Sequence, residues 1–501
     1  MGGAGAVDRP LARRTAAADP HPRRAARPVA TAPAPRTPAR PGGGVRPSQN
    51  PIDMTRERLR WRLGGLGLAL ALLLGACMTT QEANQARRER QERATARARS
   101  EMLVQLSLAA PDTSVRTIQL YGVDPATGMP SETALPVYRA RSAPLVLEFD
   151  VLRSNGRPLS VYFYHADRRW RRDLSPGEYL TGFQRDDLLN YTLSRGTQVP
   201  YVHYTYRFPN DRIQFEISGN YILRVTEQGN EDAVLFEHPF FVAEQAMPVD
   251  LTLESVMVGG QGSPSVQPAV FFRPPEALQG QVFDFSTCFV RNGRYEWARC
   301  TDQPSLTQQP LLHFYLQPET AFEPLAAEYY VDLGALRVGS RIARTDLSTS
   351  PFRILLEPDY ARFSADAFAP RLNGQPVVSA AVRSVNDPDV AAEYVSVRFA
   401  YVPPDDRPFD AEVILTGSFN RWRIDPANRL RWVPDEQRYV VDVLLKQGAY
   451  EYAYFSRDAR LRRELRSNLP RTDNLYTAFV YYRDLLRNTD RLLAVEQVVS
   501  Y

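Results

Sequence analysis

Apolar and polar residues alternate along much of the chain from about residue 113 onward. Five such segments lie at residues 143–151, 159–165, 201–208, 219–226 and 236–242. A two-residue period is typical of strands with one face in a core, and turn sequences such as Asn155-Gly156 separate these segments. The pattern predicts an immunoglobulin-like β-sandwich over residues 113–245.

The same alternation continues to the end of the chain and predicts two further sandwiches. The second covers residues 246–358, with strands near 269–273, 281–291, 293–299 and 353–357. The third covers residues 393–501, with strands in 393–402, 410–422, 438–455 and 474–483. Residues 359–392 are expected to be a linker. The fold class is therefore all-β, with tandem sandwich domains.

The first part of the chain has a different character. Residues 63–76 are apolar, which is too short for a membrane helix of about 20 residues but suits the apolar part of a signal peptide. We expect a signal peptide over residues 54–76, opening on Met54. Residues 1–53 are rich in Ala, Pro, Arg and Gly, so they either lie upstream of the true translation start or form a disordered extension.

The signal peptide ends in the sequence LGAC, residues 74–77, which resembles a bacterial lipobox. In such a motif Cys77 takes a diacylglycerol and becomes the new N-terminus. The alternative is an ordinary signal peptide with an incidental cysteine. Met78 follows, so the acidic residue that retains some lipoproteins at the inner membrane is absent. We expect a periplasmic protein, lipid-anchored at the outer membrane, with residues 77–112 as a tether.

Composition narrows the possible partners. The net charge of +4 owes much to the arginine-rich leader and tether, so it gives no support to nucleic-acid binding. Lys446 is the only lysine beside sixty arginines. Cys288 and Cys300 flank Asn292-Gly293, and a two-residue hairpin there would place Cys288 opposite Trp297. A disulfide would therefore need a longer loop or a bulge, and free buried thiols remain the alternative.

No catalytic constellation assembles from the sequence. The histidines are His21, His165, His203, His238 and His313. They show no pair at a metal-ligand spacing, and the chain contains no HExxH, GxSxG or P-loop sequence. His165 and His203 lie in neighbouring predicted strands and could meet, but hydrogen-bonded structural histidines are the favoured interpretation. We expect no enzyme activity, no metal and no cofactor.

The third unit carries a resemblance. TGSFNRW at residues 416–422 and RYVVDVLLKQGAYEYAYF at 438–455 resemble the glycogen- and starch-binding early-set domains. That resemblance implies that Trp422 and Trp432 are candidates for stacking on sugar rings. The alternative, which we favour, is that Trp422 packs under its turn. The family's sugar-contacting lysine has no evident counterpart here.

A longer resemblance covers the first unit and continues in fragments to the C-terminus. Its motifs are VRTIQLY, YFYHADRRW, SPGEYLTGF, FPND and SGNYIL within residues 115–242. They are similar to the plug proteins of the type IX secretion system of Bacteroidetes. HADRRW departs from relatives that have a cysteine after the histidine, and a lipobox is not a general feature of the family.

This resemblance implies a function without catalysis. The protein is expected to bind the outer-membrane translocon barrel from the periplasm and to occlude it when no cargo is loaded. The first unit is the expected contact, because it carries the densest resemblance. The competing hypothesis is an outer-membrane lipoprotein that binds glycans through the third unit.

Overall fold

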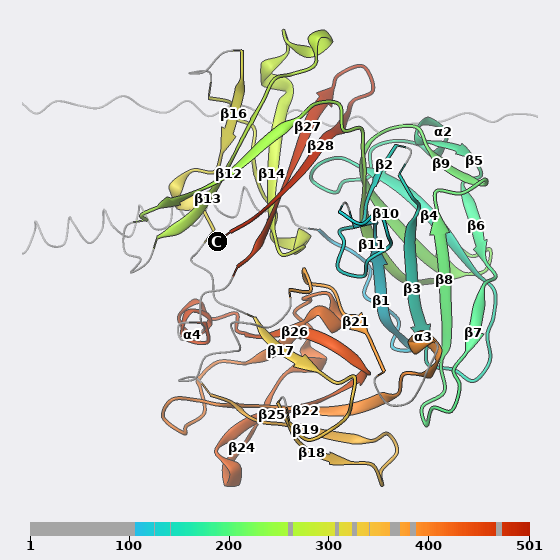
Figure 1. Ribbon diagram of the computed structural model, residues 1–501, viewed down its shortest axis with the longest axis vertical. Coiled ribbons are helices and arrows are strands. Elements are labelled where there is room, and N and C mark those ends of the chain that lie inside the picture. Colours follow the sequence, from blue (N-terminus) through green and yellow to red (C-terminus); the bar gives the residue numbers. More distant parts are fainter. Residues whose placement is uncertain are drawn as a thin grey trace, which may run out of the picture. The chain divides into compact units, whose positions relative to one another are not determined.

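The chain folds into strands joined by short turns, as Figure 1 shows. The computed structural model describes residues 106–500, except 125, 141, 259–263, 306–309, 323–327, 340, 361–370, 381–386 and 467–472. The all-β class is confirmed. The predicted signal peptide, Cys77 and most of the tether lie outside the described residues. No helix within the described part is long and apolar enough to cross a membrane.

The first domain is a sandwich of two main sheets. One sheet has the order β1 (Val115–Tyr121), β3 (Leu145–Val151), β8 (Val202–Phe208) and β7 (Tyr191–Leu193). The other has the order β2 (Val137–Arg139), β11 (Val234–Ala243), β10 (Gly219–Glu227), β4 (Leu159–Ala166) and β6 (Arg185–Leu188). The short helix α2 (Pro176–Tyr179) precedes a pair formed by β5 (Leu180–Gly182) and β9 (Ile213–Phe215).

The inward residues of this domain form one apolar core. Phe149 stands edge-on to Phe236 at 4.9 Å between ring centroids, and Phe163 stands edge-on to Phe240 at 5.9 Å. The first pair joins the two sheets, the second joins the two strands that flank β10 in one sheet, and all four rings are buried. These alternating positions are the ones whose pattern predicted the sandwich.

The second domain pairs strands from distant parts of the chain. Its first sheet contains β12 (Val249–Val256), β13 (Ser265–Phe272) and β16 (Leu312–Tyr315). Its second sheet has the order β15 (Arg299–Thr301), β14 (Phe285–Arg291), β27 (Leu475–Asp484) and β28 (Thr489–Val499). Short 3₁₀ turns lie at η1 (Glu276–Leu278), η2 (Val282–Asp284), η3 (Tyr295–Trp297) and η4 (Pro318–Thr320).

The third domain is again a two-sheet sandwich. One sheet holds β17 (Tyr329–Asp332), β26 (Gly448–Phe455), β21 (Val377–Val378) and β23 (Ile414–Gly417). The other holds β18 (Ile342–Asp346), β19 (Arg353–Leu356), β20 (Asp359–Tyr360), β22 (Tyr394–Val402), β25 (Arg438–Lys446) and β24 (Arg431–Val433). Its helical turns are α3 (Pro388–Ala391), η5 (Ser418–Asn420), η6 (Pro426–Asn428), η7 (Pro434–Glu436) and α4 (Ala459–Glu464).

The strand pairing differs from the expected division of the chain. The C-terminal hairpin β27–β28 pairs with β14 of the second domain, so the third domain is inserted between β16 and β27. Strands β17 to β19, expected in the second unit, pair with strands of the third domain. Residues 359–392, expected as a linker, contribute β20 and β21. Alternation identifies a strand but not its partner, so it could not reveal this insertion.

The hairpin of the second domain contains a disulfide. Cys288 lies directly opposite Cys300, with 4.0 Å between their Cα atoms, and the two sulfur atoms are bonded. The 3₁₀ turn η3 lengthens the loop beyond the two residues Asn292-Gly293, which shifts the register that would have placed Cys288 opposite Trp297. The condition stated from the sequence, a longer loop between the two cysteines, is therefore met, and the disulfide forms.

Candidate functional site

The sequence SPGEYLTGF builds one end of the first domain. Ser175 and Glu178 cap helix α2, because the Ser175 backbone N–H and hydroxyl both donate to the Glu178 carboxylate, at 2.8 and 2.6 Å. The Tyr179 hydroxyl then donates to the Phe163 carbonyl at 2.8 Å. Gly182 has a φ of +99°, and a Cβ atom there would lie 2.3 Å from the Arg212 carbonyl oxygen. The motif is thus a structural signature.

The HADRRW and SGNYIL sequences meet at a buried histidine. His165 Nδ1 lies 2.7 Å from the Asp173 carboxylate, and its Nε2 lies 3.2 Å from the Ser218 carbonyl oxygen. A Cβ atom on Gly219 would lie 2.3 Å from His165 Nε2, so only glycine leaves room for the imidazole. The histidine is therefore a satisfied structural residue.

An apolar seam joins the first and second domains. Phe241 of β11 stacks on Phe479 of β27 with ring centroids 4.4 Å apart, and Trp170 packs edge-on against Phe241 at 5.4 Å. Arg491 of β28 forms two parallel hydrogen bonds, both 2.8 Å, to the Glu244 carboxylate. Buried aromatic contacts and a bidentate ion pair are the features of a stable interface.

A polar junction joins the first and third domains. Lys446 at the end of β25 places its ammonium 2.7 Å from the Asp150 carboxylate and 2.6 Å from the Asp389 carbonyl oxygen. The Tyr394 hydroxyl donates to the same Asp150 carboxylate at 2.7 Å. The ammonium also lies 4.4 Å from the centre of the Tyr201 ring. The single lysine of the chain is thus fully enclosed between two domains.

The charges of this junction depend on one another. Burial alone would raise the pKa of Asp150, but the Lys446 ammonium and the His203 hydrogen bond together hold that pKa below its ordinary value. Burial would lower the pKa of His203, yet the hydrogen bond and charge of Asp150 raise it. His203 Nδ1 lies 2.8 Å from Asp150 Oδ1. The buried carboxylate thus fixes the orientation of the imidazole.

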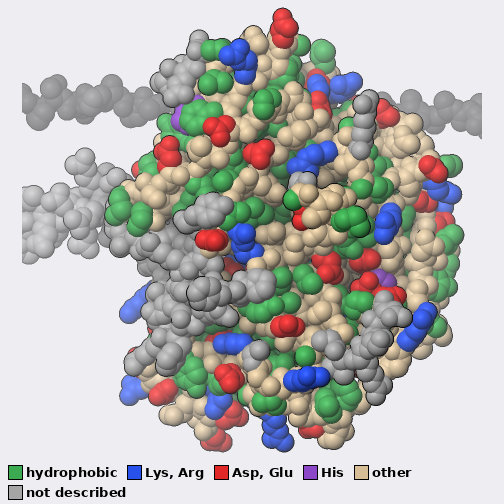
Figure 2. Space-filling view, viewed as in Figure 1, with side chains coloured by type: hydrophobic (Ala, Val, Ile, Leu, Met, Phe, Trp, Pro, Cys, Tyr) green, Lys and Arg blue, Asp and Glu red, His purple; other side chains and the backbone are tan. Residues whose placement is uncertain are grey.

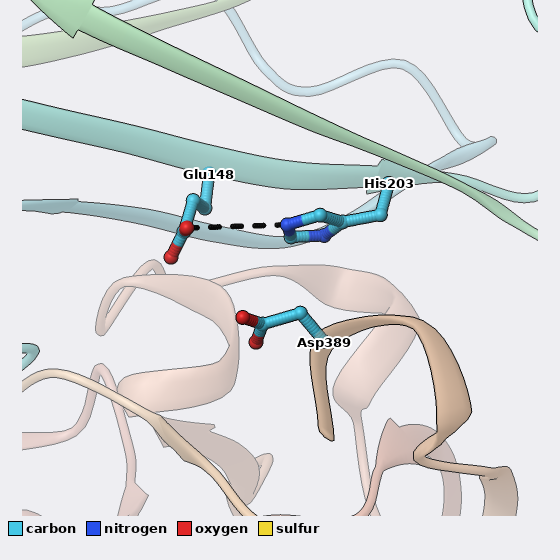
Figure 3. Close-up of side chains that lie close together, drawn as sticks. All are labelled: Glu148, His203 and Asp389. Carbon is cyan, nitrogen blue, oxygen red and sulfur yellow. Dashed lines mark ion pairs between the residues drawn. The ribbon is translucent and has the colours of Figure 1, made fainter. Parts of the chain in front are cut away.

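Glu148, His203 and Asp389 converge beside this ion pair (Figure 3). Glu148 on β3 and His203 on β8 come from neighbouring strands of the first domain, and Asp389 lies in α3 of the third. One ligand-type atom from each lies within 4.8 Å of the others, and His203 Nε2 is 4.0 Å from Glu148 Oε1. Burial raises the pKa of both Glu148 and Asp389.

One edge of the first domain leaves apolar side chains exposed. Strands β6 and β7 each end a sheet, and the segment from residue 183 to 193 connects and includes them. Phe183 is 56% exposed, Leu189 61% and Leu193 47%. The guanidinium of Arg212 lies over the Phe183 ring at 4.6 Å. We call residues 183–193 the exposed edge.

The comparisons with known proteins agree with the fold of this domain. Residues 115–244 match the family model described as "Type 9 secretion system plug protein 1st domain". The first domain belongs to this plug family. No curated protein matches the chain.

Solved structures extend the likeness in fold beyond the plug domain. A hypothetical protein from Parabacteroides merdae is 22% identical, with a TM-score of 0.69, and the match covers 79% of this chain and all of that one. It shows a shared fold across the three domains. A mutant of Salmonella alpha-2-macroglobulin matches with a TM-score of only 0.17 and 11% identity, over 80% of this chain and 24% of that one, and tells nothing further.

The tryptophans proposed for glycan binding lie outside the plug domain, and protein covers Trp422 fully and Trp432 in part. Trp422 is 7% exposed, its Nε1 donates to the Gly374 carbonyl oxygen at 3.1 Å, and the Arg294 guanidinium lies 3.5 Å from its ring centre. Trp432 is partly buried and stands edge-on to Tyr439 at 5.1 Å. Trp422 thus packs under its turn and offers no open face to a sugar.

The two histidines of the plug domain that could have met do not pair. His165 lies on β4 in one sheet and His203 on β8 in the other, each with its own carboxylate partner. Sequence reasoning missed the cluster around His203, because its other members lie 55 residues before it and 186 residues after it. The burial of the only lysine had no sequence signal apart from its rarity.

Proposed function

We propose that this protein is a non-enzymatic plug of the type IX secretion system. It binds the outer-membrane translocon barrel from the periplasm and occludes the barrel when no cargo is loaded. The observation that carries the proposal is the match of residues 115–244 to the plug family's first domain. The same match supports a location in the cell envelope.

The junctions between domains support a role as a stopper. A body that closes a wide pore must keep its shape against thermal motion and against passing molecules. The Phe241–Phe479 stack and the Lys446–Asp150 ion pair bury groups from different domains against each other. Separating such domains would expose apolar rings and an uncompensated charge. The domains are therefore expected to form one rigid body and not to move independently.

The exposed edge supplies a surface for the barrel. Leu189 and Leu193 give it apolar contact area, and its terminal strands leave backbone groups for pairing. On the face drawn in Figure 2, acidic and basic side chains are interspersed and form no continuous field of one sign. Binding is therefore expected to depend on shape and apolar contact more than on net charge.

One cleft among the described residues is lined mainly by charged side chains. It measures about 470 Å³ and lies between the first and second domains. Its lining is Asp167, Arg168, Arg169, Arg171, Phe283, Asp284, Asp302, Gln303, Arg483 and Asp490. Several of these charges neutralise each other, as in the 2.6 Å pair of Arg171 and Asp167. This lining offers guanidinium–carboxylate pairs and no nucleophile with an adjacent base.

Anchoring by lipid is part of the same proposal. A triacylated Cys77 would hold the protein at the outer membrane, close to the barrel. A palmitate analogue should label the protein, and Cys77→Ala should abolish the label. Persistent labelling of that variant, or no labelling of the unmodified protein, would refute the anchor without touching the plug.

Co-purification tests the binding itself. The full chain should be recovered with the outer-membrane translocon barrel from solubilised membranes. The paired substitution Leu189→Asp and Leu193→Asp should reduce recovery at least tenfold, because it places charge on the exposed edge. Leu347→Asp is the matched control, since Leu347 is 55% exposed on the third domain. A chain that never co-purifies with the barrel would contradict the proposal.

A further inference from the structure

Three side chains at the junction of the first and third domains form a set of metal-ligand donors. We propose that Glu148, His203 and Asp389 bind one divalent transition-metal ion, of the zinc or manganese type, that links the two domains. The donors are one imidazole nitrogen and two carboxylate oxygens, all within 4.8 Å of one another. This donor set suits Zn²⁺ and Mn²⁺.

The geometry requires only a small closure. Zinc ligands lie about 2.0–2.2 Å from the ion, so tetrahedral donor atoms stand about 3.5 Å apart. His203 Nε2 and Glu148 Oε1 are 4.0 Å apart, which is close to that value. Figure 3 shows the Asp389 carboxylate directed toward the space beside the other two groups. An ion would draw the side chains together without moving a strand.

The groups behind the ligands are those of a prepared metal site. Asp150 accepts the Nδ1 hydrogen of His203 at 2.8 Å, and the opposite ring nitrogen, Nε2, lies 4.0 Å from Glu148 and 3.3 Å from the Thr205 hydroxyl, which an ion would replace as its partner. The Tyr121 hydroxyl donates to Glu148 Oε2 at 2.7 Å and leaves Oε1 facing His203. Carboxylates and hydroxyls that orient ligands in this way raise metal affinity by 10–100-fold.

The local charge also favours a cation. The three carboxylates of Glu148, Asp150 and Asp389 face one ammonium, that of Lys446. In the deprotonated form that binds a metal, with three carboxylates, a neutral His203 imidazole and one ammonium, the group carries a net charge of about −2, which one divalent ion would neutralise.

A bound ion would form a link between the first and third domains, which we call the clip. Two ligands belong to β3 and β8 of the first domain, and the third belongs to α3 of the third domain. A bound ion would therefore oppose separation of these domains, adding to the Lys446–Asp150 pair beside it. The clip goes beyond the plug function and does not depend on it.

Metal binding by the full chain tests this inference. The protein, produced without a histidine tag and stripped with a chelator, is titrated with Zn²⁺ and, separately, with Mn²⁺. Mn²⁺ binds thiols poorly, so the Mn²⁺ titration does not report binding to the Cys77 thiol. We expect one ion per chain and a higher melting temperature with the ion. Asp389→Asn and Glu148→Gln should each weaken binding at least tenfold and remove the melting shift.

Glu132→Gln is the matched control. Glu132 lies at the same junction, where its carboxylate accepts hydrogen bonds from Gln119 at 2.6 Å and from the Val378 backbone at 3.2 Å, outside the cluster. This variant should bind as the unmodified chain does. Circular dichroism confirms that each variant is folded, and Asp389→Asn, at a partly exposed turn, is the least disruptive. Unmodified protein that binds neither ion more tightly than Asp389→Asn overturns the inference.

Discussion

Lys446 Nζ lies 2.7 Å from Asp150 Oδ2, and the two side chains are 1% and 0% exposed. The ion pair therefore joins the third domain to the first within the interior. Removing one partner of a buried pair leaves a charge without compensation, which typically costs about 3–5 kcal/mol. We expect Lys446→Met to lower the free energy of unfolding by about that amount in urea titrations.

Arg398 and Asp442 provide the control for this experiment. They also form an ion pair, at 2.9 Å, but their side chains are 27% and 34% exposed. Asp442→Asn should cost less than about 1 kcal/mol, because solvent screens the pair. Lys446→Arg should not restore stability, since a planar guanidinium needs more room than the ammonium it replaces. Equal losses for the buried and the exposed pair would contradict the account of the junction.

The disulfide should stabilise the second domain. Cys288 and Cys300 are 12 positions apart in sequence. Closing a loop of this length removes conformational entropy from the unfolded chain, which raises the free energy of the unfolded state by about 3 kcal/mol. Replacing both cysteines with alanine should reduce stability by roughly that amount. A reducing agent should lower the melting temperature of the unmodified protein and leave the double variant unchanged. Insensitivity of both to the reducing agent would exclude the bond.

Trp422 should contribute stability and not sugar binding. Its ring is enclosed by Arg294 and by its own turn, so Trp422→Ala should cost about 3–5 kcal/mol. Trp432→Ala should cost less, because Trp432 is only partly buried. Calorimetric titration with maltooligosaccharides should show weak binding or none. A stable Trp422→Ala variant that loses a clear glucan affinity would favour the glycan-binding hypothesis.

His238 should make stability depend on pH. Burial, followed by the charge of Arg421, lowers the pKa of His238 to about 3, against an ordinary value of 6.5. Between these values the unfolded chain binds a proton that the folded chain does not, so stability falls as the pH drops from 6.5 toward 3. One such proton gives a slope of about 1.4 kcal/mol per pH unit.

The variant His238→Gln should remove this slope. The measurement is the free energy of unfolding at pH 6 and at pH 4.5 for both proteins. The unmodified chain should lose more stability across that interval than the variant loses. Parallel losses would show that His238 is protonated in the folded protein.

The sequence predicted strands well and their partners poorly. The segments of the first domain lie within two residues of the observed strands, because a sandwich strand shows its buried face as alternation. The pairing of β14 with β27 joins residues nearly two hundred positions apart. The sequence of neither strand identifies the other as its pairing partner. The insertion of the third domain follows from that pairing and could not be predicted.

The polar junction between the first and third domains could not be predicted from the sequence either. Asp150 is the last residue but one of β3 and Lys446 is the last residue of β25, and a charged residue near a strand end ordinarily faces solvent. Only the packing of two domains buries both. The rarity of lysine was a signal, since sixty arginines show how readily this chain uses the other cation. A position that keeps lysine in such a chain needs a compact ammonium.

The permeability of the outer membrane tests the plug proposal most directly. Deletion of residues 113–501 should admit large antibiotics through the open barrel, and removal of the barrel as well should restore the barrier. Secretion of cargo should continue in the single deletion, because the protein is a stopper and not the channel. A deletion strain with the permeability of the parent, or a leak that persists without the barrel, would contradict the proposal.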